Sequence, residues 1–333
     1  MKFKILLLLS IITISLACSF NASASTSALA QATESIQEYK QNYQPEVYKA
    51  PPEYMFFVDF GVLLLLLFAG LYAVLKLKSQ KAVTILTLIT FAYLGFIRGG
   101  CVCPVGAISN ATMGIVNPEN VGLLTIFLFL APLIVALIAG RIFCSSGCPL
   151  GAVQQLSKKK KKYVKLPAKL NLALKIIPVI ILFATIYFAY TKQCFFICKL
   201  EPYKAIFFTG QSWTEQLWAL ITSQPMEVRF LFAGTLITWI YLIGILILGF
   251  WVPRPFCRFI CPYGVLLGIF SVFSFKRRKI KDTCVYCGLC EKVCPTQAIK
   301  IDRKTKTSYI SNYDCVQCNA CNNACKKDSI KMG

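Results

Sequence analysis

Cysteine dominates the residues of this chain that could do chemistry. The 333 residues include 17 cysteines and no histidine. Without histidine the chain lacks the ligands of bis-histidine haem and of the usual zinc and non-haem iron sites. A secreted disulfide scaffold would be much smaller than this chain. So many thiols therefore indicate thiolate ligation of a metal, and we predict iron–sulfur clusters and no haem.

Eight of the cysteines form two identical runs near the C-terminus. Each run has the spacing C-x2-C-x2-C-x3-C, which is typical of bacterial ferredoxins with two 4Fe–4S clusters. In that pattern the fourth cysteine of each run ligates the other cluster. The predicted ligands are Cys284, Cys287, Cys290 and Cys325 for one cluster, and Cys315, Cys318, Cys321 and Cys294 for the second.

The two runs resemble each other beyond their cysteines, since residues 294–300 are similar to residues 325–331. One departure is Lys326, which stands where the first run has Pro295. Proline is not a ligand, so the predicted number of clusters is unchanged. The alternative is a zinc-ribbon-like tail built from CxxC pairs, and two identical runs of four cysteines argue against it.

Eight further cysteines form four pairs, each just past the end of a predicted membrane span. In three of the pairs an arginine precedes the cysteines, and a proline and a glycine follow them. The arginines are predicted to compensate the negative charge of a thiolate-ligated centre. These three groups are Arg98 with Cys101 and Cys103, Arg141 with Cys144 and Cys148, and Arg254 with Cys257 and Cys261. The fourth pair, Cys194 and Cys198, lacks the arginine, proline and glycine.

Long apolar stretches supply the elements that position these pairs. Hydrophobic residues make up 56% of the chain, and several apolar runs approach the length that crosses a bilayer of about 30 Å. We expect about five transmembrane helices, at residues 56–75, 82–98, 121–140, 172–191 and 230–250. The apolar stretch 264–275 is too short to cross and is expected to lie along the cytoplasmic interface.

The N-terminus reads as a signal sequence, because Lys2 and Lys4 precede a short apolar stretch and then small residues. Acylation of Cys18, as in a lipoprotein, is the alternative. The expected domains are a signal sequence (1–30), a short periplasmic segment (31–55), a transmembrane domain (56–275) and a ferredoxin-like α+β domain (276–333). The predicted class is thus an α-helical polytopic membrane protein with a C-terminal domain for two 4Fe–4S clusters.

Charge gives the expected orientation. Residues 141–171 and those after 251 are strongly basic, and basic loops of membrane proteins remain in the cytoplasm. This distribution explains the formal charge of +22, and no nucleic-acid-binding motif accompanies it. We therefore expect a multi-pass protein of the bacterial cytoplasmic membrane, in contact with lipid, with its C-terminus in the cytoplasm and no nucleic acid partner.

The same topology sorts the paired cysteines into two quartets. Cys144, Cys148, Cys257 and Cys261 would face the cytoplasm, and Cys101, Cys103, Cys194 and Cys198 would face outward. Four thiols suffice for one cluster, so we predict one or two further iron–sulfur centres. For the outward quartet, disulfides are the alternative, since that side is oxidising.

The two C-x3-C-P motifs, at 144–149 and 257–262, are joined to a two-cluster ferredoxin tail. This combination resembles the NapH/NosR-type membrane ferredoxins over roughly residues 56–333. The resemblance implies electron transfer in anaerobic respiration, from quinol through the membrane toward a periplasmic reductase, cytochrome or flavoprotein. The large flavin-binding domain of the NosR branch does not fit into residues 31–55. The pairs at Cys101 and Cys194 go beyond the motifs of the family.

The sequence therefore predicts a membrane-bound electron-transfer protein between a cytoplasmic or quinol donor and a periplasmic redox partner. A quinol dehydrogenase needs a proton acceptor, and Asp59 in the first span is the candidate; no catalytic residue is assigned. One alternative is a maturation or regulatory membrane ferredoxin for a metalloenzyme. The other is a thiol–disulfide relay that uses the outward cysteines.

Overall fold

The computed structural model describes residues 53–97, 104–116, 123–156, 167–192 and 236–333, which lie in one compact unit from Glu53 to Gly333. The predicted signal sequence and almost all of the predicted periplasmic segment lie outside these residues.

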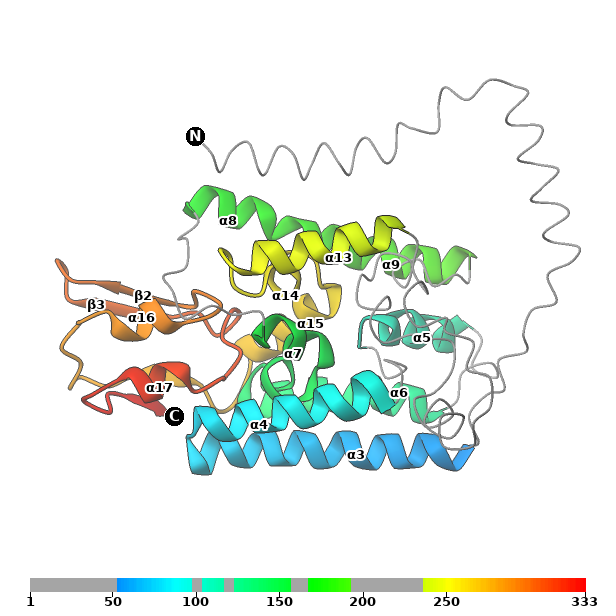
Figure 1. The fold of residues 1–333 in the computed structure, drawn as a ribbon, viewed down its shortest axis with the longest axis horizontal. Helices are drawn as coiled ribbons and strands as arrows, with labels where there is room; N and C mark the ends of the chain where they lie inside the picture. Colours follow the sequence, from blue (N-terminus) through cyan, green and yellow to red (C-terminus); the bar gives the residue numbers. More distant parts are fainter. Residues whose placement is uncertain (1–52, 98–103, 117–122, 157–166, 193–235) are drawn as a thin grey trace, which may run out of the picture. The chain divides into compact units, whose positions relative to one another are not determined.

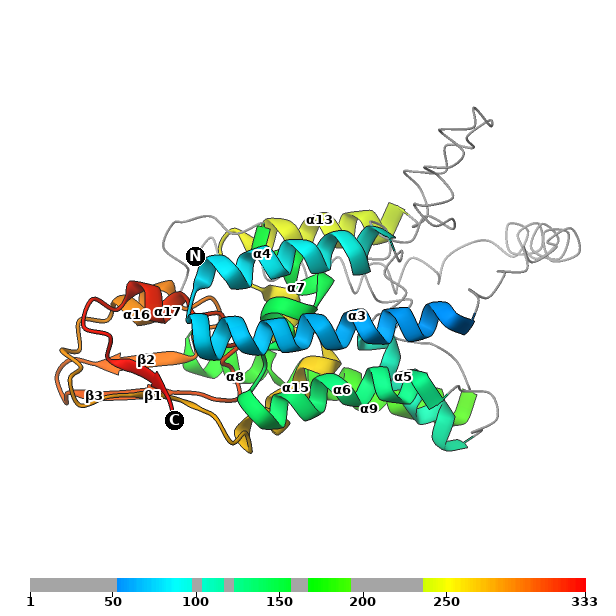
Figure 2. The same cartoon turned by 90° about the horizontal axis from the view of Figure 1, so that it is seen from below.

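Two long helices lie side by side in both views of the molecule (Figures 1 and 2). The first, α3 (Glu53–Tyr72), continues as the π-helix η1 (Ala73–Leu77), and the second, α4 (Gln80–Thr90), continues as η2 (Phe91–Ile97). The Ser79 hydroxyl begins α4 by accepting a hydrogen bond from the Ala82 N–H at 3.4 Å.

The remaining apolar helices complete a helical bundle. They are α5 (Pro104–Val116), α6 (Leu123–Ala139), α8 (Ala168–Leu174), α9 (Ile176–Lys192) and α13 (Leu236–Gly249). Three stretches are long and apolar enough to cross a membrane: Phe57–Leu77, Gln80–Ile97 and Lys169–Thr191. They overlap the spans expected at 56–75, 82–98 and 172–191. The other two expected spans contain helices of 17 and 14 residues, α6 and α13.

Short helical segments in the centre of the bundle carry the cysteine motifs (Figure 1). They are η4 (Phe143–Gly147), α7 (Pro149–Leu156), α14 (Pro255–Phe259) and α15 (Pro262–Val272). Most residues of α15 are buried, and the helix packs against α6 and α9. That this stretch lies at the cytoplasmic interface rather than crossing the membrane stays a prediction; within the fold, Gly264 and Gly268 allow the close approach of Arg141 and Tyr313.

The C-terminal tail consists of two consecutive copies of one unit. Its elements are β1 (Arg278–Ile280), α16 (Leu289–Val293) and β2 (Ile299–Asp302), followed by β3 (Thr307–Ile310), α17 (Ala320–Ala324) and β4 (Ile330–Met332). Strand β1 pairs antiparallel with β4, and β2 with β3. Each two-stranded sheet therefore combines strands from both copies, which fixes the copies to each other.

Candidate iron–sulfur sites

The first group of thiols in the tail draws on both copies of the repeated unit. The pKa of Cys290 is raised to about 11, chiefly by burial, and the neighbouring thiols of Cys284, Cys287 and Cys325 contribute to the rise. The sequence predicts these four cysteines as the ligands of one cluster. The fold thus brings them together although Cys325 belongs to the second cysteine run and the other three to the first.

The second group of thiols in the tail also combines cysteines from both runs. Burial raises the pKa of Cys321 to about 12, and the thiols of Cys318, Cys315 and Cys294 contribute to the rise. Here too the members are those that the sequence predicts for one cluster. Because thiols with such pKa values are protonated at neutral pH, metal binding at this quartet would release protons.

Backbone N–H groups donate hydrogen bonds to the fourth cysteine of each run, which is predicted to ligate the cluster of the other run. The N–H of Ala298 donates to the sulfur of Cys294 at 3.3 Å, and the N–H of Ser329 donates to the sulfur of Cys325 at 3.4 Å. Hydrogen bonds of this kind favour the thiolate over the thiol. The donor set and its hydrogen bonds therefore fit thiolate ligation of an iron–sulfur cluster.

Lys326 takes the place of Pro295 without changing the turn. In both copies a backbone N–H shortly after the last cysteine donates to that cysteine's carbonyl at 3.3 Å. The donors, Gln297 and Asp328, both have positive φ, at 54° and 45°. Proline at this position is therefore not required for the local backbone.

Among the residues that the structure describes, no three cysteine, aspartate or glutamate side chains are close enough to hold one metal ion. A 4Fe–4S cluster binds each thiolate through a different iron atom and so suits a wider quartet. All twelve cysteines in the described part of the chain carry free thiols.

Arg278 is the cation beside the second group of thiols. It is buried, and its guanidinium donates to the side chains of Gln317 at 2.7 Å and Asn322 at 3.1 Å, and to the sulfur of Cys321 at 3.7 Å. Its counterpart in the other copy is Tyr309, which is exposed. The two groups of thiols therefore differ in local charge.

We expect Arg278→Met to lower the reduction potential of one tail cluster by on the order of 50 mV, because a buried positive charge stabilises the reduced, more negative form. A redox titration followed by electron paramagnetic resonance would measure the shift. Lys279→Met, one position along and exposed, is the matched control and should leave both potentials unchanged. Equal shifts in both clusters would contradict the assignment.

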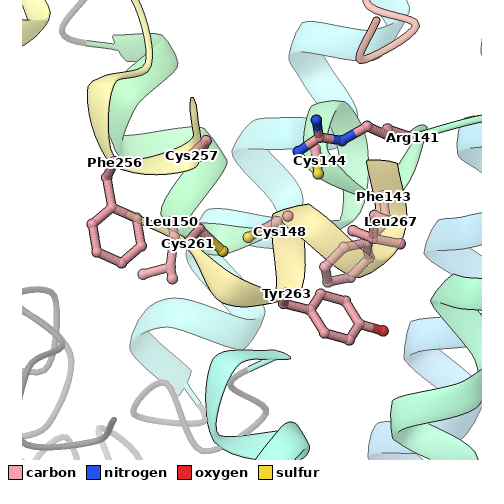
Figure 3. A pocket seen from close by; sticks show the side chains of 11 residues that line it. Arg141, Phe143, Cys144, Cys148, Leu150, Phe256, Cys257, Cys261, Tyr263 and Leu267 are labelled. Carbon is pink, nitrogen blue, oxygen red and sulfur yellow. The ribbon is translucent and has the colours of Figure 1, made fainter. Parts of the chain in front are cut away.

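The predicted cytoplasmic quartet lines one pocket in the centre of the bundle. Cys144, Cys148, Cys257 and Cys261 all border it, together with Arg141. In Figure 3 the thiols of Cys148 and Cys261 face each other, and Cys144 lies on the side of Arg141. Two motifs that are far apart in the sequence therefore meet, as the sequence predicts.

The proline and glycine that both motifs share have a local physical role. Each proline is the first residue of a helix, α7 or α15, where its fixed φ suits the helix and its missing N–H is not needed. A side chain at Gly151 would lie 2.6 Å from the carbonyl of Cys144, and one at Gly264 would lie 3.1 Å from the carbonyl of Cys257. The glycine lets each helix begin directly against its own preceding cysteine turn.

Arginine and glutamine side chains connect the two motifs. The guanidinium of Arg254 donates to the Cys144 carbonyl at 2.9 Å and to the Gln155 side chain. The Gln154 amide donates to the sulfur of Cys257 at 3.1 Å. Burial raises the pKa of Cys257 to about 11, whereas Arg254 and Arg141 lower it. Sequence reasoning missed both glutamines, because an i, i+1 polar pair at the end of an apolar helix carries no motif of its own.

Arg141 links this pocket to the tail. It borders the pocket beside Cys144, and its guanidinium donates to the Tyr313 carbonyl at 2.9 Å. Tyr313 lies just before Cys315 of the second tail group. Nearby, Lys175 forms an ion pair with Asp314 at 2.6 Å. The membrane quartet and the second tail group are therefore connected through one buried side chain.

Other predicted site residues do not meet in this way. Asp59 is buried in α3, and the residues that line the cysteine pocket do not include it. Cys18 lies outside the described residues. So do the predicted outward quartet and its arginine, which are Cys101, Cys103, Cys194, Cys198 and Arg98.

Comparisons with known proteins identify iron–sulfur binding domains in this chain. Residues 121–167 and 232–280 match the family model described as a 4Fe-4S binding domain, and residues 283–329 match a 4Fe-4S dicluster domain. The uncharacterized protein MJ0750 of Methanocaldococcus jannaschii is 31% identical over 73% of this chain and 90% of its own length. The regulatory protein NosR of Stutzerimonas stutzeri is 24% identical over 52% of this chain. This chain belongs to the NapH/NosR-type membrane ferredoxins.

The membership makes the chain an iron–sulfur electron-transport protein with 4Fe–4S binding domains. The putative electron transport protein YccM of Escherichia coli is 27% identical over 64% of this chain and 57% of its own length. The match to NosR covers only 22% of that protein. No solved structure matches the chain. The matches thus cover only part of YccM and of NosR.

Proposed function

We propose that this membrane ferredoxin passes electrons between a cytoplasmic or quinol donor and a redox partner on the outer side of the bacterial cytoplasmic membrane. The chain would cross the membrane about five times and keep its tail in the cytoplasm. Cys284, Cys287, Cys290 and Cys325 would hold one 4Fe–4S cluster, and Cys294, Cys315, Cys318 and Cys321 a second. When bound, these clusters supply one-electron redox chemistry.

The contact through Arg141 carries this proposal. A tail that served only to bind a partner would not need a buried side chain that lies beside Cys144 and donates to the loop before Cys315. We infer that the quartet of Cys144, Cys148, Cys257 and Cys261 holds a further iron–sulfur centre. Cys144 and Cys148 are buried in this pocket, and Arg141 and Arg254 would compensate charge there.

Protein reconstituted into liposomes tests the function. We expect dithionite added outside to reduce ferricyanide trapped inside several-fold faster than in protein-free liposomes, because a bilayer of about 30 Å blocks direct transfer. Iron-free protein, prepared anaerobically in the same liposomes, is the control. Trapped ferricyanide that stays oxidised beside protein with its full iron content would contradict transmembrane transfer.

A further inference from the structure

The two copies of the tail unit present the same loop to different surroundings. We call residues 284–292 the exposed loop and their counterpart in the second copy, residues 315–323, the docked loop. Val285 is 60% exposed, whereas its counterpart Val316 is 3% exposed. Leu289 is 37% exposed, and its counterpart Ala320 is 5% exposed. The same backbone therefore carries a free apolar face in one copy and a covered one in the other.

Contacts within the chain explain the covered face. Val316 and Cys318 belong to the same hydrophobic cluster as Ala73 and Val74 of η1, and the Asn319 amide donates to the Ala73 carbonyl at 3.4 Å. The docked loop thus lies against the helical bundle beside the second group of thiols. In this copy the loop face packs against another part of the same chain, beside a predicted cluster site.

The exposed loop presents an apolar face of the same kind, and the side chains of Val285 and Leu289 on it are exposed. Cys287, one of the predicted cluster ligands, is exposed between Val285 and Leu289. Apolar contact at the centre with a polar rim is the usual form of a specific protein interface. An exposed ligand also lets a partner protein approach the cluster site closely, whereas the buried thiols do not.

The rim of the exposed loop is basic. Lys292 is exposed on α16, and the Arg303 guanidinium donates to the Cys287 carbonyl at 2.8 Å. Lys326 and Lys327, both exposed, follow Cys325 of the same thiol group. The loop's own carboxylate is Glu291. The whole tail, residues 276–333, contains 13 Lys and Arg against five Asp and Glu, so the surface attracts acidic molecules.

We propose that the exposed loop, with its basic rim, is the docking surface for an acidic, soluble one-electron carrier protein. The inference rests on the proposed function and names the donor or acceptor on the tail side. One electron passes between the carrier and the site that the exposed loop helps to form; one is oxidised and the other reduced, and no covalent bond or proton is exchanged. The complementary charges speed the encounter and weaken it as salt is added.

Binding to full-length protein in nanodiscs of neutral phosphatidylcholine tests the proposal, with an acidic soluble ferredoxin as the probe. We expect Lys292→Glu/Lys327→Glu to raise the dissociation constant roughly tenfold at low ionic strength. Sodium chloride should weaken wild-type binding progressively. Lys81→Glu/Lys169→Glu changes the net charge equally at exposed positions outside the tail and should change binding less than about twofold. The ferredoxin should also protect residues 284–293 from hydrogen exchange.

Several results would separate this proposal from the function above. The milder Lys292→Gln/Lys327→Gln should show about half the effect, which keeps the test valid if the double reversal misfolds. Unchanged binding by the tail variants, or protection only elsewhere, would overturn the docking surface. Binding to anionic phosphatidylglycerol vesicles without ferredoxin binding would also overturn it. If iron is present and dithionite still reduces the trapped acceptor, the proposed function stands whatever the ferredoxin does.

Discussion

Replacing Cys290 and Cys294 together by serine is expected to disrupt both iron–sulfur sites of the tail, although both residues belong to the first cysteine run. Cys290 groups with Cys284, Cys287 and Cys325, whereas Cys294 groups with the cysteines of the second run. Each site would then keep three thiols of four. Cys290→Ser/Cys325→Ser removes two thiols from one site and should leave the other intact.

Iron and sulfide analysis with electron paramagnetic resonance distinguishes the two variants. The first variant should alter the signals of both tail clusters, and the second should lose about four iron atoms and keep one signal unchanged. The second variant is the matched control, because it also replaces two cysteines. The opposite result, one intact site in Cys290→Ser/Cys294→Ser, would mean that each run holds its own cluster.

Cys148→Ser/Cys261→Ser should remove the proposed centre in the membrane part and leave both tail clusters in place. The two thiols face each other across the pocket, and burial raises the pKa of each above the usual thiol range. A serine hydroxyl is a poor replacement for a soft thiolate ligand. We expect about four fewer iron atoms per protein and loss of electron transfer across liposomes.

Tyr263→Phe is the control for this variant. Tyr263 lines the same pocket and donates to the Phe129 carbonyl at 2.8 Å, so its replacement disturbs the packing without removing a sulfur. Its iron content should equal that of the wild type. Equal iron in the double cysteine variant would show that these thiols only pack, and the proposal of a third centre would fail.

Cysteine spacing was the more informative sequence signal. It predicted which thiols lie together, whereas hydropathy predicted the helices less completely. The short, regular spacing within each run constrains which thiols meet, so both tail groups and the quartet around Cys148 appear in the fold as expected. Hydropathy counts apolar residues but does not distinguish lipid from protein as their surroundings. For this reason hydropathy could not show that most residues of α15, in the stretch 264–275, are buried against other helices.

The position of the tail against the helices could not be predicted. Its contacts depend on single residues far apart in sequence, such as Arg141 with Tyr313 and Lys175 with Asp314, and neither pair belongs to a motif. The exposure difference between Val285 and Val316 also follows from this docking alone, because the two loops have nearly the same cysteine pattern.

Three of the hydrogen bonds that join the tail to the helices have backbone carbonyls as their acceptors. Arg141 donates to the carbonyl of Tyr313, Ser271 to that of Asn312, and Asn319 to that of Ala73, at 2.9, 2.9 and 3.4 Å. A carbonyl is present whichever side chain the residue carries. A change of side chain at an acceptor residue therefore leaves its hydrogen bond possible, and these three bonds depend on the donor side chains of Arg141, Ser271 and Asn319.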